Sequence, residues 1–438
     1  MEKLIYGGDG LARLPADEKG RGKAVFVPFV LPGEKIEATL TEQKPGFARA
    51  RPESVLEPSP HRVEPVCPYF RRCGGCHYQH AGYEHQLAIK KEVLFEAVKR
   101  TAKLDMAVDV QVHPSPPWNY RNRSRLKVQI VPEFKAGYFK MSSHELLAVE
   151  HCPISSRLIN GGIAALWQSG RAGKVPAGVS EIEFFANAED TELLIEVSAK
   201  SDTRRATLRA WAEDFRTSMP EIMGVVVFRE SHNGSQPTLE RLLTLGADHL
   251  MYRSARATYR VSAGSFFQTN RFLTDELVRI VTEGQCGEVA LDLYAGVGLF
   301  STALSDMGHI VSVESSQIST GDLSYNLPSK AEAVRATTEQ YLSGSAKARR
   351  PSKGGSSSVP PKPDVALVDP PRAGLGERVA TMLVNLATPR LIYVSCDPVT
   401  LARDLAVLLA GGYRIERLHL VDLFPQTFHL ETVVHLAH

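Results

Sequence analysis

The sequence predicts a multidomain protein with an all-β amino-terminal barrel, a central α+β domain and a carboxy-terminal α/β domain on a doubly wound parallel sheet. Three observations lead to this prediction. At 438 residues the chain is longer than one hydrophobic core usually serves. The segment up to about residue 58 alternates short β-like runs with turn signals. From about residue 261 onward, apolar runs typical of buried parallel strands alternate with helix-like segments.

Residues 1–58 are expected to form the barrel. The runs KAVFVPFV and KIEATLTEQ have the composition of strands, and Pro32-Gly33 between them is a turn signal. Small barrels of this kind carry nucleic acid in many proteins. This part of the chain therefore predicts a nucleic-acid-binding module.

Residues 59–260 are assigned to the central domain, which begins with a cluster of cysteines and continues with a helical segment near 83–103 and several strands. Basic residues alternate along one of these strands, at Arg121, Arg123, Arg125 and Lys127. On a strand they share one face. That face is either an RNA contact or a solvated surface.

Three of the six cysteines, Cys67, Cys73 and Cys76, lie within ten residues, and Cys152 follows in EHCPI. Thiols crowded in this way favour a metal or cluster site over a disulfide framework in an intracellular chain. Their spacing fits zinc or an iron–sulfur cluster about equally.

Residues 261–438 carry a glycine loop, LDLYAGVGLF at 291–300, between an apolar strand and a helix. Gly296 and Gly298 allow a tight turn and close approach of a ligand. Glu314 ends the next predicted strand, where a carboxylate binds ribose hydroxyls. The loop alone also fits nicotinamide binding or a simple turn, but the third glycine of the dinucleotide fingerprint is absent.

Candidate catalytic residues follow apolar strands in this domain. Cys396 in RLIYVSCDP and Asp369 in VDPPRAG both come where open α/β sheets bind their ligands. Glu431 lies in the apolar run LETVVHL, where a carboxylate is costly unless it has a partner or a role. The alternatives are that Cys396 is a buried structural cysteine, that Asp369 belongs only to a stiff Pro-Pro turn and that Glu431 is a solvent-facing strand residue.

Composition excludes several classes of protein. Hydrophobic residues make up 43%, and no apolar run approaches the length that spans a bilayer. The start, MEKLIYGGDG, does not resemble a signal segment. We therefore expect a cytoplasmic monomer without membrane contact.

The stretch 343–363, rich in Ser, Gly, Pro and Lys, predicts a flexible surface loop without function.

Taken together, these motifs resemble the RNA uracil-5 methyltransferase family over nearly the whole chain. The matching segments occur in the family's order: LPGE at 31–34, the cysteines, SFFQTN at 265–270, LDLYAGVG, VDPPRAG, YVSCDPVTLARDL and DLFPQTFHLE. The resemblance implies a TRAM-like OB barrel, a central α+β domain with an iron–sulfur cluster and a Rossmann-like class I methyltransferase domain. Ala295 departs from the pattern, since many members have cysteine there, and the 343–363 insertion is unusual.

The resemblance also implies roles for individual residues. S-adenosylmethionine would be held by residues around the glycine loop and the neighbouring strand ends: Gln268, Tyr294, Gly296, Glu314 and Asp369. Cys396 would be the nucleophile and Glu431 the general base. A [4Fe–4S] cluster, favoured over zinc, would be bound by Cys67, Cys73, Cys76 and Cys152.

The chemistry accounts for these residue types. Carbon 5 of uracil is too weak a nucleophile to accept a methyl group until a thiolate adds to carbon 6. A general base must then remove the extra hydrogen from carbon 5. The uracil must also leave its stack in the RNA to reach such a pocket. The alternatives are an amino or small-molecule methyltransferase, which needs no cysteine, and a catalytically inactive RNA-binding protein. As partner we expect RNA, with ribosomal RNA favoured over transfer RNA because cluster-bearing members often modify it.

Overall fold

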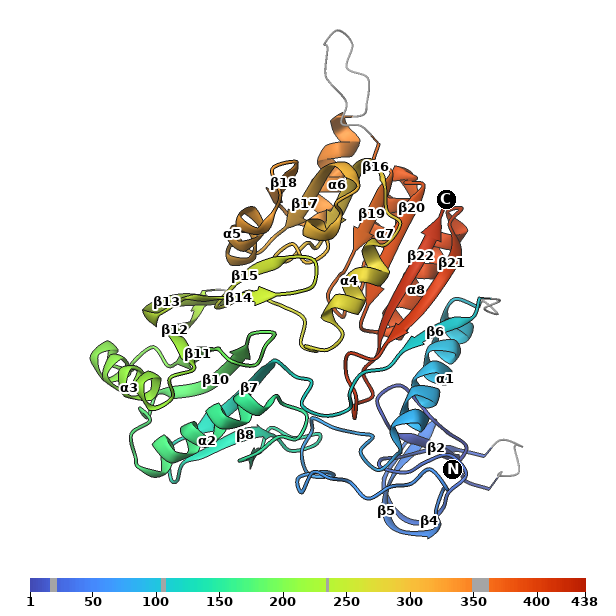
Figure 1. Ribbon diagram of the computed structural model, residues 1–438. Coiled ribbons are helices and arrows are strands. Elements are labelled where there is room, and N and C mark those ends of the chain that lie inside the picture. The colour runs from blue at the N-terminus through green and yellow to red at the C-terminus, as the bar shows by residue number, and fades with distance from the viewer. Residues whose placement is uncertain (16–21, 104–107, 234–235, 349–361) are drawn as a thin grey trace.

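The computed structural model describes residues 1–15, 22–103, 108–233, 236–348 and 362–438. Figure 1 shows three β-rich bodies: the amino-terminal barrel at the lower right, the central sheet at the lower left and the carboxy-terminal sheet above them. None of the helices in these ranges is both long and apolar enough to span a membrane.

The amino-terminal body is a strongly curved sheet with strand order β1-β2-β3-β5-β4. Its inward side chains alternate along the strands and include Val25, Val27, Ala48 and Ala50. The two predicted strands appear as β3 and β4. The strands are β1 (Lys3–Leu4), β2 (Gly10–Arg13), β3 (Ala24–Val27), β4 (Lys35–Gln43) and β5 (Phe47–Glu57).

In the LPGE turn, the buried carboxylate of Glu34 accepts a hydrogen bond from the Leu31 amide at 2.8 Å. It also binds the guanidinium of Arg62 at 2.7 Å. This turn therefore joins the barrel to the segment that leaves it.

The central body is a sheet of order β13-β12-β11-β10-β7-β8-β9, with two helices packed against it. Ile163 and Leu166 of one helix and Leu208 and Trp211 of the other complete a buried core with the strands. The elements are β7 (Arg123–Gln129), β8 (Lys135–Phe139), β9 (Leu146–Ala148), α2 (Arg157–Arg171), β10 (Val179–Ala186), β11 (Leu193–Ala199), α3 (Arg205–Ser218), β12 (Ile222–Asn233) and β13 (Gln236–Gly246).

The carboxy-terminal sheet has the order β18-β17-β16-β19-β20-β22-β21-β6. The run from β18 to β20 is parallel, and β22 is antiparallel to both of its neighbours, β20 and β21. The predicted α/β domain on a parallel sheet is confirmed. Its elements are β16 (Gly287–Leu293), β17 (Met307–Glu314), α5 (Gln317–Asn326), β18 (Ala331–Arg335), α6 (Thr338–Ala348), β19 (Val365–Val368), α7 (Gly376–Leu386), β20 (Arg390–Ser395), α8 (Pro398–Ala410), β21 (Arg414–Val421) and β22 (Glu431–Ala437).

The two faces of this sheet are covered differently. One face packs against α1 (Tyr83–Thr101), α7 and α8. The other packs against α4 (Thr274–Thr282) and the hairpin of β14 (His249–Arg253) and β15 (Thr258–Ser262). Phe185 and Val226 of the central sheet belong to this second core. A continuous apolar core therefore joins the central and carboxy-terminal bodies.

Helix α1 and strand β6 (Val110–His113) lie with the carboxy-terminal sheet, although the sequence prediction placed them in the central unit. Strand β6 extends the sheet in parallel beside β21. Ile89 and Leu94 of α1 share a buried core with Leu401 and Leu405 of α8. These contacts join segments some 300 residues apart, which local sequence patterns do not reveal.

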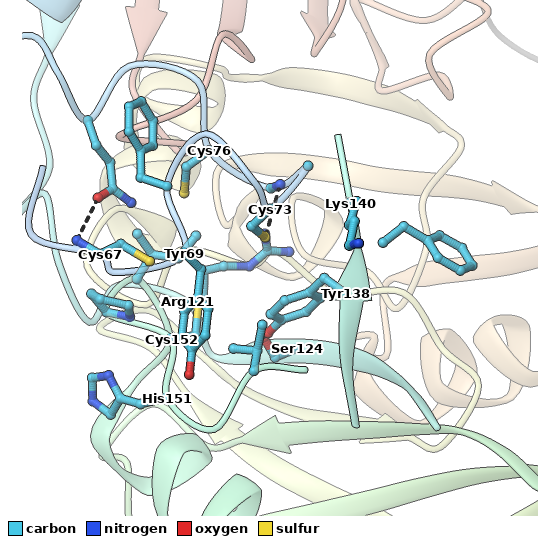
Figure 2. Close-up of a pocket in the computed structure, with 18 of the residues that line it drawn as sticks. Cys67, Tyr69, Cys73, Cys76, Arg121, Ser124, Tyr138, Lys140, His151 and Cys152 are labelled. Atoms are coloured by element: carbon cyan, nitrogen blue, oxygen red, sulfur yellow. Dashed lines mark hydrogen bonds between the residues drawn. The ribbon is translucent and has the colours of Figure 1, made fainter. Parts of the chain in front are cut away.

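The prediction of an iron–sulfur cluster in the central domain is wrong. Cys67, Cys73, Cys76 and Cys152 do line one cavity of about 660 Å³ (Figure 2). Yet among the described residues no three Cys, His, Asp or Glu side chains are placed so that they could hold a metal ion. Burial raises the pKa of the Cys73 thiol to about 11 and that of Cys76 further, which favours neutral thiols over the thiolates that bind metals. The sequence spacing brings the thiols into one cavity but does not set the direction of each side chain.

The 343–363 insertion begins within α6, and its residues 349–361 lie outside the described part of the chain. Residue 362 leads into β19 at the amino end of that strand. The insertion therefore joins the sheet at the end opposite to the one where the candidate site residues lie.

Candidate functional site

Cys396 directly follows β20, and Glu431 begins the adjacent strand β22, so both lie at one edge of the carboxy-terminal sheet. In the antiparallel pair of β20 and β22, Ser395 is the register partner of Thr432. Cys396 follows Ser395 as the chain leaves β20, and Glu431 precedes Thr432 as the chain enters β22. The strand register therefore brings the predicted nucleophile and the predicted base together across 35 residues of sequence.

The same edge carries three of the predicted cofactor residues. Val368 of β19 is paired with both Leu293 of β16 and Tyr393 of β20. Asp369 thus leaves its strand between the ends of β16 and β20. Tyr294 follows β16, and Glu314 ends β17 beside it. The order along the edge is Glu314, Tyr294, Asp369, Cys396 and Glu431.

The half-buried Cys396 thiol is surrounded mainly by acidic groups. Its pKa is raised to about 12, chiefly by burial and in addition by the nearby charges of Glu431, Asp369 and Asp397, whereas the charge of Arg372 lowers it. In the free protein the group is therefore a neutral thiol near pH 7. Ionisation requires that a neighbouring carboxylate lose its charge or that the thiol proton be taken up nearby.

The Glu431 side chain is only 4% exposed. Burial raises its pKa well above the usual value for glutamate, and the charge of Asp369 adds to the effect. Burial and the charge of Asp292 raise the pKa of Asp369 to about 7. Two neighbouring carboxyls with raised pKa values are suited to hold and exchange a proton near neutral pH.

The glycine loop adopts the backbone that its sequence predicts. Tyr294, Gly296 and Gly298 have φ values of 65°, 57° and 92°. The Gly296 amide donates to Glu314 Oε2 at 3.0 Å, and the Ser316 amide donates to Oε1 at 2.6 Å. The carboxylate of Glu314 therefore fixes the loop to the end of the next strand.

The loop leaves space for a ligand. No atom lies within 4 Å of the position where a side chain on Gly296 would begin. This open space lies beside the carboxylate of Glu314, to which the Gly296 amide donates, as a nucleoside with ribose hydroxyls requires. The residues present thus fit S-adenosylmethionine.

Asp292 is a polar residue of this site that the sequence reading did not single out. It is 1% exposed, accepts a hydrogen bond from the Ser301 hydroxyl, and its Oδ1 has no partner among the described groups. Burial raises its pKa to about 7, and the charge of Glu314 contributes. An aspartate inside the apolar strand LDL was the available signal.

Gln268 lies in a buried segment beside the sheet. Asn270, two residues later, donates to the Leu423 carbonyl at 3.1 Å and to the Ser115 hydroxyl at 2.9 Å, so it fixes the segment in place. The Ser265 hydroxyl donates to Asp322 of α5 at 2.7 Å. These contacts place the segment of Gln268 against the helix that follows Glu314.

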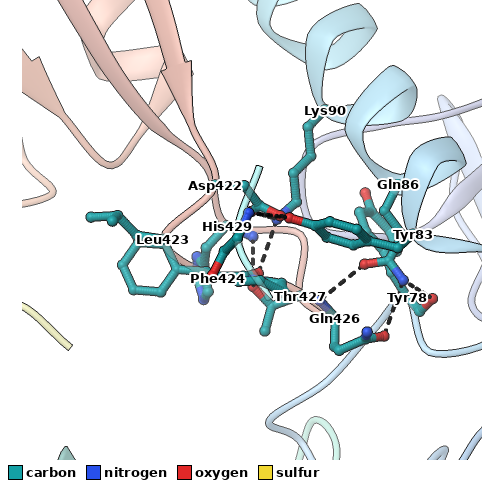
Figure 3. Close-up of polar contacts among 12 residues, drawn as sticks. Tyr78, Tyr83, Gln86, Lys90, Asp422, Leu423, Phe424, Gln426, Thr427 and His429 are labelled. Atoms are coloured by element: carbon teal, nitrogen blue, oxygen red, sulfur yellow. Dashed lines mark hydrogen bonds and ion pairs between the residues drawn. The ribbon is translucent and has the colours of Figure 1, made fainter. Parts of the chain in front are cut away.

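The loop from Asp422 to Leu430 leads into Glu431 and is held by a network from α1 (Figure 3). The ammonium of Lys90 binds Asp422 Oδ1 at 2.6 Å and the Phe424 carbonyl at 2.9 Å. The Tyr83 hydroxyl donates to Asp422 Oδ2 at 2.9 Å. The Gln86 and Gln426 side chains also form a hydrogen bond at 3.0 Å. Sequence patterns do not predict this network, because the contacting residues of α1 and of the loop are more than 330 positions apart.

His429, in the same loop, has its Nε2 3.4 Å from the Arg372 guanidinium. Burial lowers its pKa to about 3, and the charge of Arg372 contributes. The ring is therefore neutral at physiological pH.

The basic strand of the central domain is neutralised by acids of neighbouring strands. Arg125 binds Glu183 at 2.6 Å, and Lys127 forms an ion pair with Glu181. Arg123 lies 3.2 Å from Glu183 and stacks over Phe185. The strand is thus largely a paired network, which argues against most of it as an RNA-binding face.

Comparisons with known proteins agree with this geometry. Residues 82–438 match the family model described as tRNA (Uracil-5-)-methyltransferase, and residues 2–52 match the TRAM domain. The chain is 31% identical over 437 residues to an uncharacterized RNA methyltransferase of Aquifex aeolicus, covering 99% of this chain and 96% of that protein. It is 32% identical to another from Streptomyces avermitilis, covering 98% and 95%.

Among solved structures, the chain is similar to the Pyrococcus abyssi tRNA (uracil-54, C5)-methyltransferase in complex with S-adenosyl-L-homocysteine. The TM-score is 0.72 at 24% sequence identity, and the match covers 98% of this chain and 100% of that one. This similarity supports the fold that the strand order describes. The family match over residues 82–438 and the identity to the Aquifex aeolicus protein show that the chain belongs to the tRNA (uracil-5-)-methyltransferase family.

Proposed function

We propose that this enzyme methylates carbon 5 of a uridine in RNA through a covalent adduct with Cys396, and that Glu431 is the general base. The observation that carries this proposal is the register of β20 and β22, which sets the thiol beside a buried carboxyl. An amino methyltransferase would need neither group.

Cys396 acts first in this scheme. Its thiolate adds to carbon 6 of uracil, which gives carbon 5 the electron density of an enolate. Because the pKa of the thiol is raised, its proton must leave as the uracil approaches. The carboxylate of Asp369 is the nearby acceptor, which leaves the Glu431 carboxylate unprotonated for the last step. Arg372 favours the thiolate because its charge lowers the pKa of Cys396.

Glu431 acts last. Methylation leaves carbon 5 with one hydrogen too many, and the Glu431 carboxylate removes it as a proton. The electron pair of that C–H bond reforms the double bond between carbons 5 and 6 and expels the Cys396 thiolate. Burial strengthens Glu431 as a base, since it raises the pKa of the carboxyl.

The bound cofactor supplies an electrophilic methyl group on a sulfonium. Gly296 would provide the open backbone and Glu314 the acceptors for ribose hydroxyls, and Tyr294 follows β16 at the same edge of the sheet. Asp369 and Gln268 complete the proposed set. Asp292 accepts a hydrogen bond from the Ser301 hydroxyl and thereby holds the segment that follows the glycine loop.

For the RNA substrate, the sequence reading favoured ribosomal over transfer RNA because of the iron–sulfur cluster. That argument no longer holds, since the cluster prediction is wrong. The matching family and the similar Pyrococcus abyssi enzyme are both named for transfer RNA. We therefore propose transfer RNA as the substrate, with ribosomal RNA as the alternative.

A tritium-release assay tests the reaction. Transfer RNA and ribosomal RNA transcripts made with uracil labelled at carbon 5 are incubated with the protein and S-adenosylmethionine. We expect release of tritium to water in step with formation of 5-methyluridine, from transfer RNA before ribosomal RNA. Methylated nucleosides without tritium release would contradict methylation at carbon 5. Release from ribosomal RNA alone would restore the earlier substrate prediction.

A further inference from the structure

Tyr6, a residue of the amino-terminal barrel, reaches the catalytic edge of the carboxy-terminal sheet. Its hydroxyl donates a hydrogen bond to Asp397 Oδ2 at 3.0 Å, across 391 residues of sequence. Asp397 is the neighbour of Cys396 in the chain. This contact is part of neither the cofactor site nor the reaction proposed above.

The other oxygen of Asp397 is already engaged. Oδ1 accepts hydrogen bonds from the amides of Val399 at 2.9 Å and Thr400 at 3.0 Å, so it caps the amino terminus of α8. The phenol of Tyr6 therefore completes the hydrogen bonding of a carboxylate whose orientation is fixed by the helix. Cys396 immediately precedes this cap, where the chain turns from β20 into α8.

Tyr6 also contacts the loop that carries the proposed base. Its ring meets the ring of Phe428 edge-on, with the centroids 5.3 Å apart. Phe428 in turn packs against His77 at 4.6 Å and His429 at 4.2 Å. One side chain of the barrel thus touches the segments of both Cys396 and Glu431.

The turn that bears Tyr6 is firmly docked. Leu4, in β1, is 4% exposed and belongs to the core that α1 and α8 share. Lys3 forms an ion pair with Glu96 of α1 at 2.6 Å. At Gly8, a side chain would begin only 3.1 Å from the Cβ of His77. The position of Tyr6 is therefore set by packing on both sides and not by its hydroxyl alone.

We propose that Tyr6 is a positioning residue through which the barrel holds Asp397 and Phe428 and thereby tunes the reactivity of Cys396. This inference rests on the proposed function, in which Cys396 is the nucleophile. The hydroxyl proton offsets part of the charge of Asp397, which otherwise opposes ionisation of the thiol. Docking of the RNA-binding barrel is thus linked to a reactive cysteine.

Several charged groups act on the same thiol. Glu431 from β22, Asp369 after β19 and Asp397 all raise the pKa of Cys396, and Arg372 lowers it. His429 and His77 face Phe428, but burial lowers their pKa values to about 3 and about 4, so both rings are neutral near pH 7. Of these groups, Asp397 is the one that Tyr6 reaches with a hydrogen bond.

The test measures alkylation of Cys396 by iodoacetamide, followed by mass spectrometry of its peptide, at several pH values between about 7 and 9. In this range the rate follows the thiolate fraction. Tyr6→Phe keeps the ring contact and removes the hydrogen bond. We expect alkylation to slow by about 3- to 10-fold, as a rise of roughly half to one unit in the thiol pKa gives. Tyr413→Phe, which removes a hydroxyl from another part of the same core, should have no effect.

Asp397 provides the matched background. In Asp397→Asn, Tyr6→Phe should slow alkylation no further, because the charge that the hydroxyl offsets is gone. Equal alkylation of Tyr6→Phe and the unaltered protein, or equal slowing in both backgrounds, would overturn the proposal. If Tyr6→Phe fails to fold, Asp397→Asn is compared with the unaltered protein. Alkylation of Cys396 should then be faster in Asp397→Asn, and an equal or slower rate would overturn the proposal.

Methyl transfer provides the second readout. Tyr6→Phe should lower kcat while the KM for RNA stays within about twofold, whereas a direct RNA contact would raise KM and leave alkylation unchanged, which would contradict the inference. The alkylation assay needs neither RNA nor cofactor. A Cys396→Ala protein that still methylates RNA would refute the proposed function and leave the alkylation result intact, so the two failures are distinguishable.

Discussion

The ammonium of Lys90 lies 2.6 Å from Oδ1 of Asp422, and neither side chain is more than 1% exposed. This ion pair joins α1 to the loop that precedes Glu431. Burial lowers the pKa of Lys90, and Asp422 opposes that shift, so the charge of Lys90 depends on its partner. The pair therefore fixes the approach of the loop to the catalytic edge.

Lys90→Met should destabilise the protein by about 3–5 kcal/mol, because it leaves a buried carboxylate without its partner. Replacing both residues, as Lys90→Met with Asp422→Leu, should recover much of the stability but not the activity, since Phe424 also loses its contact. Lys91→Met is the matched control, because Lys91 pairs with an exposed Asp109 and should cost at most about 1 kcal/mol. Urea unfolding measures all three. Equal losses for Lys90→Met and Lys91→Met would rule out the role of the buried pair.

Glu314→Ala should weaken binding of S-adenosylmethionine by about 10- to 150-fold, since hydrogen bonds to charged groups are worth roughly 1.5–3 kcal/mol. The variant also frees the amides of Gly296 and Ser316. Glu332→Ala, on the exposed face of the neighbouring β18, is the control and should bind normally. Isothermal titration calorimetry gives both affinities. An unchanged affinity of Glu314→Ala would exclude Glu314 from the cofactor site, but not the enzyme class.

Asp292 predicts a pH dependence of stability. Its pKa rises from 3.8 to about 7 in the folded protein, so the folded state binds the proton more tightly than the unfolded chain does. Stability from this group is present below about pH 4 and is lost as the pH rises toward 7. Asp292→Asn should therefore gain stability over the unaltered protein across that window, by up to about 4 kcal/mol.

The comparison uses thermal unfolding of the cofactor-free protein between about pH 4 and 8. Asp306→Asn, an exposed residue, should follow the unaltered protein at every pH. If the stability gained by Asp292→Asn is the same at about pH 4 and about pH 8, Asp292 does not titrate between these pH values.

The ion pairs along β7 predict that the arginines of this protein contribute unequally to RNA binding. Arg71 and Arg72 are exposed, whereas Arg125 binds Glu183 and Glu181. If RNA passes over the exposed pair, Arg71→Gln and Arg72→Gln should each reduce the salt dependence of RNA binding by about one ion. Arg125→Gln should change it little. Filter binding over a salt series measures the slopes, and the reverse ranking would place RNA on the central strand.

Much of this architecture could be predicted from local patterns. The apolar strands after residue 261 and the glycine loop required no distant contacts, because a parallel strand and a tight turn are encoded where they occur. The position of Cys396 at the end of a strand also followed from sequence, as did the placement of Glu431 in an apolar run. Their adjacency did not, since it depends on the register of β20 with β22.

Other features depend on contacts that sequence order hides. Lys90 and Tyr6 reach the site from segments more than 300 residues away. The alternating basic residues of β7 were visible, but their glutamate partners on β10 were not connected to them by spacing. The metal-site prediction was wrong for a different reason. The cysteines do lie together, but the side-chain directions that a metal site requires are set by the tertiary fold.

The covalent adduct tests the central claim most directly. Transfer RNA containing 5-fluorouracil is incubated with the protein and S-adenosylmethionine and analysed on a denaturing gel, since fluorine cannot leave carbon 5 as a cation. We predict a heat-stable, slowly migrating RNA–protein band that depends on the cofactor and is absent in Cys396→Ala. With ordinary RNA, Glu431→Gln should accumulate the same band with methylated RNA in it, because elimination stalls without the base. Normal methylation by Cys396→Ala would contradict the covalent mechanism, and normal turnover by Glu431→Gln would assign the base to another group, such as His429 or a water held by Asp369.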